Sequence, residues 1–408
     1  MKKGSKRLNG EGSIYPYPYG FRAYVWVVTP EGRRQRKYVT ATTREAVRAK
    51  MIALQRAAAN GPMATSTPTL EAFLTGWLKD VVRPNLAPTT AKNYEMFTRL
   101  YILPDLGKRR LDRLSVREVQ AWVNDLRTRC QCCAQGKDAA RAEPRCCAVG
   151  QCCRQVPKDW TVRQAWTILR SALSAAQREE LVTRNVAGLV RMPVPRTDRA
   201  TIWSVEQVRR FLDSASADRD PLLVGYTLVL VLGLRRGEVL GLAWEDVDLE
   251  ETEARIAWQL QRVDGSLVRR RTKTTSSDAV LPLPDICLVA LKDRRALEAT
   301  WRGRTAEAWQ DCGLVMTTQY GMPIDPRNFH RMFKARARKA RVPEISVHSA
   351  RRTCASLLVA LNVHPRVAMS ILRHSQIAVT MDVYSQATAE GTRNALRDLG
   401  AAIADGQR

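Results

Sequence analysis

The sequence of 408 residues has no stretch that could cross a membrane as a helix. Its longest apolar run, Leu222 to Leu234, is shorter than the ~20 residues that a membrane span needs, and it ends at a pair of arginines. No signal-like segment precedes this run. We therefore expect a cytoplasmic protein without membrane association, in which residues 222–234 form a buried helix.

Acidic residues are scarce relative to basic ones. Aspartate and glutamate number 40 against 66 lysines and arginines, which gives a formal net charge of +26. Such an excess argues against a typical enzyme of small metabolites and predicts a polyanionic partner, most commonly nucleic acid. The alternative is a basic surface that is merely solvated. Because the basic residues are spread over every segment of the chain, we favour the nucleic-acid partner.

Secretory features are also missing, and this bears on the ten cysteines. Seven of them lie between Cys130 and Cys153, without the extracellular context that favours disulfides. Cys130 and Cys133 have zinc-like spacing, and Cys147 with Cys152 could complete four thiolate ligands. Three interpretations stay open: a structural zinc ion, a reduced metal-free loop, and a redox-sensing segment.

Sequence patterns divide the chain into three predicted domains and favour a mainly α-helical protein with small β-sheets. Residues 1–66 are expected to form a three-stranded sheet plus a helix. Residues 67–195 carry amphipathic helical stripes, interrupted by the cysteine-rich insert 130–153. Residues 196–408 mix helical and strand patterns, which predicts an α/β domain.

Local signals predict where individual elements begin. Helices are expected after four capping residues: Thr42, Thr89, Ser115 and Ser204. In the last domain, Ile256, Trp258 and Leu260 alternate with other residues before a turn at Asp264-Gly265. With a return strand at residues 279–283, they predict a second three-stranded sheet.

Two basic segments are candidate nucleic-acid surfaces. The first is the return strand of the N-terminal hairpin, with the cationic residues Arg33, Arg34, Arg36 and Lys37. A basic ribbon beside several tyrosines suits a DNA groove, although the sheet could also serve only for packing. The second is a basic helix expected over residues 329–341. Three of its residues are expected to face phosphates: Lys334, Arg336 and Arg338.

Phosphate-binding and proton-exchanging residues gather between Val347 and Tyr384. His348 and Arg351 are three apart near the start of a predicted helix, so they can point the same way. His374 and Tyr384 follow. A tyrosine with a pKa near ~10 is a weak nucleophile at neutral pH unless cations or a base lie close. Arginines match phosphate oxygens and could neutralise the charge that grows on an attacked phosphodiester, so the segment predicts phosphoryl transfer to protein.

Further candidate groups come earlier in the chain. Arg235 and Glu238 are three apart, so the carboxylate can hold the guanidinium in one rotamer; a plain surface ion pair is the alternative. Lys273 lies in a predicted turn and is one of only two lysines over residues 159–333. A lysine whose pKa can be lowered can give up a proton, which an arginine cannot.

In order and spacing, these residues resemble the tyrosine recombinases, specifically the phage-type integrases. The resemblance rests on Arg235 in Gly-Leu-Arg-Arg-Gly-Glu, Lys273 in a turn, His348-x-x-Arg351, Leu-x-His374 and Tyr384. It extends to the helical segment, which is similar to the family's core-binding domain, and to the N-terminal sheet, which is similar to its arm-binding domain. The cysteine-rich insert lies outside the pattern.

The resemblance implies that Tyr384 attacks the scissile phosphate, giving a 3′-phosphotyrosine and a free 5′-hydroxyl. It assigns the non-bridging oxygens to Arg235, Arg351 and His374. Lys273 would protonate the leaving oxygen.

The other implied roles support this chemistry. His348 would act as general base or proton holder, and Glu238 would support Arg235. No metal or nucleotide is needed for catalysis, because the phosphotyrosine conserves the bond energy for rejoining.

Three residues depart from the family pattern. Arg373 replaces the glycine common before the second histidine, Arg352 stands where histidine is frequent, and Asp278 stands where a basic residue is common. These departures concern local geometry and DNA contacts.

The implied partners are double-stranded DNA attachment sites, three further copies of the chain in a homo-tetramer on DNA, and an excisionase or a host DNA-bending protein. Leu396, Leu399 and Ile403 would form a tail helix on a neighbouring subunit. Two alternatives use the same sequence features: a type IB topoisomerase-like nicking and rejoining enzyme, and a non-catalytic DNA-binding regulator.

Overall fold

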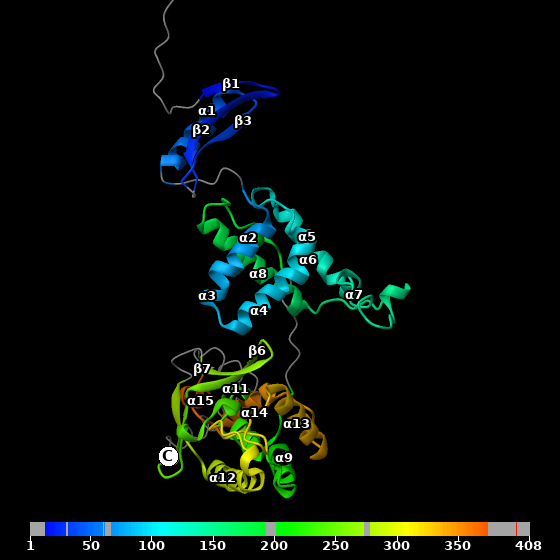
Figure 1. Ribbon diagram of the computed structural model, residues 1–408, viewed down its shortest axis with the longest axis vertical. Helices are drawn as coiled ribbons and strands as arrows, with labels where there is room; N and C mark the ends of the chain where they lie inside the picture. The colour runs from blue at the N-terminus through cyan, green and yellow to red at the C-terminus, as the bar shows by residue number, and fades with distance from the viewer. Residues whose placement is uncertain are drawn as a thin grey trace, which may run out of the picture. The chain divides into compact units, whose positions relative to one another are not determined.

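The protein is described by a computed structural model (Figure 1). The described residues are 13–29, 32–59, 61, 67–192, 201–272, 278–373 and 397. The chain divides into two compact units, residues 1–196 and 197–408. Within the described ranges, no helix is both long and apolar enough to cross a bilayer. The mainly helical architecture with small antiparallel sheets confirms the predicted fold class.

The N-terminal part is a three-stranded antiparallel sheet of order β1-β2-β3 with one helix. The elements are β1 Ser13–Tyr17, β2 Gly20–Val28, β3 Arg34–Ala41 and α1 Arg44–Ala59. Val25 and Val27 alternate along β2 and are buried with Leu54 of α1, which therefore covers one face of the sheet (Figure 1). The hydroxyl of Thr43, not that of Thr42, caps α1 by accepting the Ala46 N–H at 3.2 Å.

The helical part of the first unit follows. Its helices are α2 Leu70–Trp77, α3 Arg83–Asn85, α4 Pro88–Phe97, α5 Leu103–Leu106, α6 Val116–Thr128, α7 Gln131–Ala134 and α8 Asp159–Arg178. The predicted capping box of Ser115 with Glu118 is confirmed at α6. The predicted cap at Thr89 is wrong: α4 begins at Pro88, whose fixed φ and missing N–H suit the first helical position.

The second unit mixes helices with short strands. The helices among its described residues include α9 Val205–Ala217, α10 Leu223–Val231, α11 Arg236–Gly241, α12 Asp285–Thr305, α13 Pro326–Lys339, α14 Val347–Ala360 and α15 Pro365–Leu372. Its strands are β4 Val247–Asp248, β5 Glu253–Ile256, β6 Trp258–Val263, β7 Ser266–Arg271 and β8 Ala279–Pro282. The predicted buried helix is α10, whose Tyr226 packs with Phe211 and Phe333 in an aromatic core. Ser204 caps α9 as expected, with Gln207 completing the box.

The described strands of this unit form two sheets instead of the single three-stranded sheet predicted. Strands β4, β5 and β8 form one sheet, and β6 with β7 form a separate hairpin. The chain changes sheet at Ala257, whose carbonyl accepts the Thr272 N–H at 2.9 Å. The hairpin packs closely on α11, where a Cβ added to Gly241 would lie 2.7 Å from the Cα of Gln259. The absence of a side chain at Gly241 therefore lets β6 lie directly against α11.

Candidate active site

Glu238 organises the start of α11. Its Oε2 accepts the backbone N–H of Arg235 at 2.8 Å, and its Oε1 accepts from the Arg235 guanidinium at 2.6 Å. The carboxylate is buried, whereas the Arg235 side chain is 41% exposed. The predicted contact between Glu238 and Arg235 is therefore present, with the guanidinium partly exposed.

Arg373 is the second partner of the same carboxylate. It ends α15 with φ 51° and ψ 49°, the left-handed conformation that favours glycine. Its buried guanidinium donates to Glu238 Oε2 at 2.6 Å. The arginine at the position where the resemblance leads us to expect glycine thus keeps the backbone conformation that favours glycine and adds a buried ion pair with Glu238.

Electrostatics keep this carboxyl ionised. Burial alone would raise the pKa of Glu238, but the charges of Arg373 and Arg235 outweigh it and hold the pKa below its usual value. The Glu238 carboxylate consequently binds two guanidinium groups, the partly exposed one of Arg235 and the buried one of Arg373.

Arg351 ties together the segments that carry these residues. Its buried guanidinium donates to the carbonyls of Gly233, before α11, and of Leu372, at the end of α15. Desolvation lowers its pKa to about 10, so it stays charged at neutral pH. Two of its five N–H donors are used in these bonds.

The loop before α11 lies so close to α14 and α15 that it requires a glycine at position 233. Gly233 has φ +61°, and an added Cβ would lie 2.6 Å from Leu372 Cδ2 and 3.2 Å from Cys354 Sγ. The loop before α11 can therefore pass directly against α14 and α15.

His348 lies in the first turn of α14, one turn before Arg351. Its side chain is exposed, yet the atoms packed around it partly desolvate the imidazole. This desolvation, followed by the charges of Arg352, Arg351 and Arg235, lowers the pKa of His348. At neutral pH His348 is therefore uncharged and lies near the positive charges of Arg352, Arg351 and Arg235.

One face of α14 is buried. The buried positions are Val347, Ala350, Arg351, Thr353, Cys354, Ala355 and Val359. Arg351 therefore faces inward, whereas His348 is exposed. Leu361 lies beyond the helix end and is 72% exposed.

The structure thus brings together Arg235, Glu238, His348 and Arg351 from distant parts of the sequence. Three other predicted catalytic residues lie outside the described residues: Lys273, His374 and Tyr384. The first follows Thr272, and the second follows Arg373 directly. Their roles stay predictions. The tail residues Leu396, Leu399 and Ile403 also lie outside the described ranges.

The outer face of the N-terminal sheet is basic and aromatic. The guanidinium of Arg36 lies 4.7 Å from the ring centre of Trp26, and that of Arg34 lies 5.4 Å from the same ring. Arg33 is exposed just before β3. Lys37 pairs with the buried Val25, so strand alternation places it on the opposite side, toward α1. The DNA-binding role of this sheet stays a prediction, with Arg34 and Arg36 on one face.

The basic helix α13 presents fewer free charges than expected. Arg336 is mostly buried and pairs with Asp218 and Asp220, which fastens α13 to the segment between α9 and α10. Arg338 and Lys334 remain partly exposed and pair with Glu344 at 3.2 and 3.9 Å. Arg336 therefore serves packing, and the expected phosphate contacts rest on the other two.

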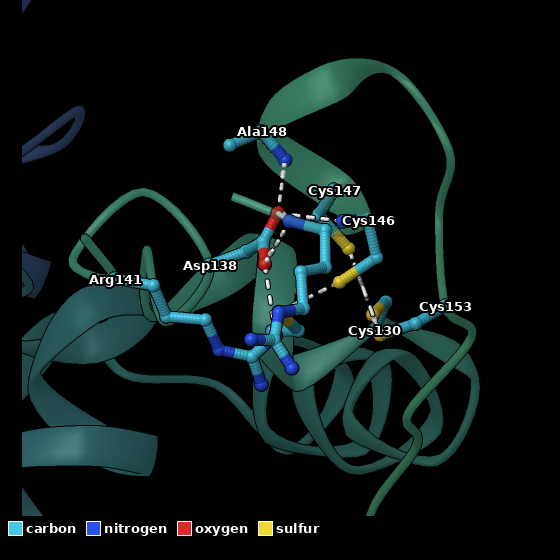
Figure 2. A network of polar contacts seen from close by, with 9 residues as sticks. Cys130, Asp138, Arg141, Cys146, Cys147, Ala148 and Cys153 are labelled. Carbon is cyan, nitrogen blue, oxygen red and sulfur yellow. Dashed lines mark hydrogen bonds and ion pairs between the residues drawn. The ribbon is translucent and has the colours of Figure 1, made fainter. Parts of the chain in front are cut away.

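The seven cysteines of the insert lie close together, and Figure 2 labels Cys130, Cys146, Cys147 and Cys153 among them. The Sγ atoms of the four predicted zinc ligands, Cys130, Cys133, Cys147 and Cys152, lie within 4.8 Å of one another. A second set with the same spread consists of Cys132, Cys146, Cys147 and Cys153. The sequence-based prediction named only the first set, because spacing alone could not assign the doubled cysteines.

Two family models match the chain. The phage integrase family matches residues 204–390, and the SAM-like N-terminal domain of phage integrases matches residues 69–127. A "Tyrosine recombinase XerC-like" protein of Caldanaerobacter subterraneus subsp. tengcongensis is 24% identical and covers 81% of this chain and 82% of its own length. An integrase of Saccharopolyspora erythraea is 22% identical, with 97% of each chain covered.

Solved structures show the same fold. The Tn1549 transposon integrase in complex with transposon right end DNA has a TM-score of 0.64 at 18% identity, covering 82% of this chain and all of that one. A lambda integrase dimer bound to a COC′ core site has a TM-score of 0.52 at 15% identity, covering 95% of this chain and 98% of that one. Both likenesses extend over the helical and the mixed α/β parts.

Proposed function

Because this chain belongs to the tyrosine recombinase family, we propose that it is a site-specific DNA recombinase that integrates and excises a mobile element. The observation that carries the proposal is the convergence of Arg235, Arg351 and His348, with Glu238 fixing the first of them. A strongly basic chain, with a formal charge of +26, supports a DNA substrate.

In the proposed reaction, the phenolic oxygen of Tyr384 attacks the phosphorus of one DNA strand. A bond forms between this oxygen and phosphorus, and the bond from phosphorus to the 5′ oxygen breaks. His348 takes the phenolic proton and Lys273 supplies a proton to the leaving oxygen. Arg235 and Arg351, with His374, neutralise the non-bridging oxygens as charge grows. Rejoining runs the same steps in reverse with a 5′-hydroxyl from another strand.

This chemistry requires no metal or nucleotide, because the phosphotyrosine retains the energy of the broken phosphodiester. The protein is proposed to work in the cytoplasm on double-stranded attachment sites, as a homo-tetramer. An excisionase or a host DNA-bending protein would set the direction of the reaction. The lambda integrase tetramer bound to a Holliday junction supports the assembly by analogy of fold.

The proposal is tested with a nicked suicide substrate that carries a candidate attachment site, in a buffer without added metal or nucleotide. We expect an adduct stable to SDS and a released strand whose free 5′-hydroxyl accepts phosphate from a kinase. Supercoiled plasmid without an attachment site is the control, and it should stay supercoiled. Absence of any adduct, or rapid relaxation of the control plasmid, would contradict a site-specific recombinase.

The lowered pKa of His348 predicts its titration behaviour. In the DNA-free protein its imidazole should titrate below the ordinary 6.5, because protonation must oppose desolvation and nearby guanidinium charges. The folded state therefore prefers the neutral ring. The free energy of unfolding should decrease as the pH falls from 6.5 through the lowered pKa of His348. Histidine NMR titration, assigned with His348→Gln, measures the value; an apparent pKa above 6.5 would be inconsistent with this environment.

A further inference from the structure

We propose that the insert of residues 130–153 binds two divalent metal ions of the zinc type through its seven cysteines, with the Cys147 thiolate shared between them. Each ion would take four sulfur ligands. The first site is Cys130, Cys133, Cys147 and Cys152; the second is Cys132, Cys146, Cys147 and Cys153. Two sets of four that share one member account for all seven cysteines of the insert.

The distances between sulfur atoms match metal coordination. Cys133 and Cys152 of the first set are 3.7 Å apart, and Cys132 and Cys146 of the second are 3.9 Å apart. A disulfide would need about 2.05 Å. Four thiolates at about 2.3 Å from a tetrahedral zinc ion lie about 3.8 Å from one another. These pairs are therefore spaced as two ligands of one zinc ion, and the other sulfurs of each set lie within 4.8 Å of them.

Cys147 lies where the two sets meet. Its Sγ is 3.9 Å from that of Cys130 in the first set and 3.7 Å from that of Cys153 in the second. Cys130 and Cys153 are in turn 3.7 Å apart, so the three sulfurs form a triangle (Figure 2). A thiolate at this junction can donate lone pairs to both ions.

A buried carboxylate shapes the loop that carries the shared ligand. Asp138 is 1% exposed and accepts the backbone N–H groups of Arg145, Cys146 and Ala148 at 2.8 to 3.1 Å (Figure 2). The guanidinium of Arg141 donates to the same carboxylate at 3.0 Å. These bonds fix the backbone on both sides of Cys147. The position of this ligand is therefore set by hydrogen bonds within the loop.

The insert has little else to hold it together. Residues 130–153 are all described, and the buried ones are Cys130, Gln131, Cys132 and Asp138. None of them has an aliphatic or aromatic side chain, so burial of apolar surface cannot order the segment. Small segments of this kind are ordered by metal binding, whose free energy becomes folding free energy. Metal ions bound by the cysteine sulfurs would therefore supply the order that apolar burial does not.

Charge and ligand chemistry favour this assignment. Two divalent ions and seven thiolates carry a net charge of −3 (+4 − 7), and Lys137, Arg145 and Arg154 supply nearby positive charge in the sequence, whereas Arg141 is paired with Asp138. All-thiolate tetrahedral sites select zinc among the common divalent metals.

The full-length protein, purified with reductant after expression in zinc-supplemented medium, tests the proposal. We expect two zinc ions per chain by elemental analysis. We also expect the seven cysteines to resist alkylation until a chelator is added, while the exposed Cys312 reacts at once. One ion per chain with Cys132, Cys146 and Cys153 reactive would leave a single site and overturn the proposal. No metal and seven reactive thiols would overturn it too, as would protection that only a stronger reductant removes.

A matched pair of variants resolves the two sites. Cys152 and Cys153 are adjacent and both exposed, but they belong to different sets. Cys152→Ser should lose one zinc ion and expose Cys133 to alkylation, whereas Cys153→Ser should lose the other and expose Cys132. Cys312→Ser should keep both ions. Identical alkylation patterns for the first two variants would show one undivided site and contradict two ions. Because the wild-type measurement is independent of these variants, a variant that fails to fold leaves the test intact.

Discussion

Replacing Tyr384 by phenylalanine is expected to abolish the covalent protein–DNA adduct and to leave DNA affinity unchanged. The substitution removes only the attacking oxygen, while the guanidinium and imidazole groups that would bind phosphate remain. Removal of a covalent nucleophile costs a rate factor on the order of 10⁶, which places cleavage below detection. Suicide-substrate gels measure the adduct, and electrophoretic mobility shifts measure binding.

Tyr320→Phe is the matched control for this variant. Tyr320 is an exposed tyrosine of the same unit, 46% accessible, and the proposed chemistry gives it no role. Its variant should form adduct at the wild-type rate. Adduct formation by Tyr384→Phe at undiminished yield would move the nucleophile to another residue.

Replacing Glu238 by alanine is expected to cost both stability and activity. The change leaves the guanidinium of Arg373 buried without its anion, which typically costs about 3–5 kcal/mol in free energy of unfolding. It also frees Arg235 to change rotamer, which should slow cleavage by a factor of about 10² to 10³, the effect of losing one fixed transition-state donor. Urea unfolding and single-turnover cleavage measure the two effects.

A double variant separates the two roles of Glu238. Glu238→Ala with Arg373→Gly removes the stranded charge and relieves the left-handed backbone strain, worth about 1–2 kcal/mol. Stability should therefore recover in part, while cleavage stays slow because Arg235 still lacks its partner. Recovery of cleavage together with stability would show that Glu238 acts only through the fold.

Local features of the site could be predicted from the sequence, whereas contacts between distant segments could not. Arg235 and Glu238 are three residues apart on one helix, so their pairing follows from helical geometry. The bond from Arg373 to Glu238 joins segments far apart in the sequence, and no periodicity relates them. Only the replacement of an expected glycine marked Arg373 as unusual, and this signal said nothing of its partner.

The other differences between prediction and structure also arise from contacts that a local sequence pattern does not contain. The alternation at Ile256 and Trp258 is continuous in the sequence, but the chain changes sheet between them. The basic pattern of α13 could not reveal that Arg336 turns inward to two aspartates. In the insert, spacing indicated one set of four cysteines, and only their positions in space reveal the second set.

The central claim is that Tyr384 becomes joined to DNA, and locating the adduct tests it most directly. The wild-type protein would be trapped on a nicked suicide substrate, digested with nuclease and protease, and analysed by tandem mass spectrometry. We predict a nucleotide phosphate attached to Tyr384 through its phenolic oxygen. A phosphate attached to any other residue would contradict the account.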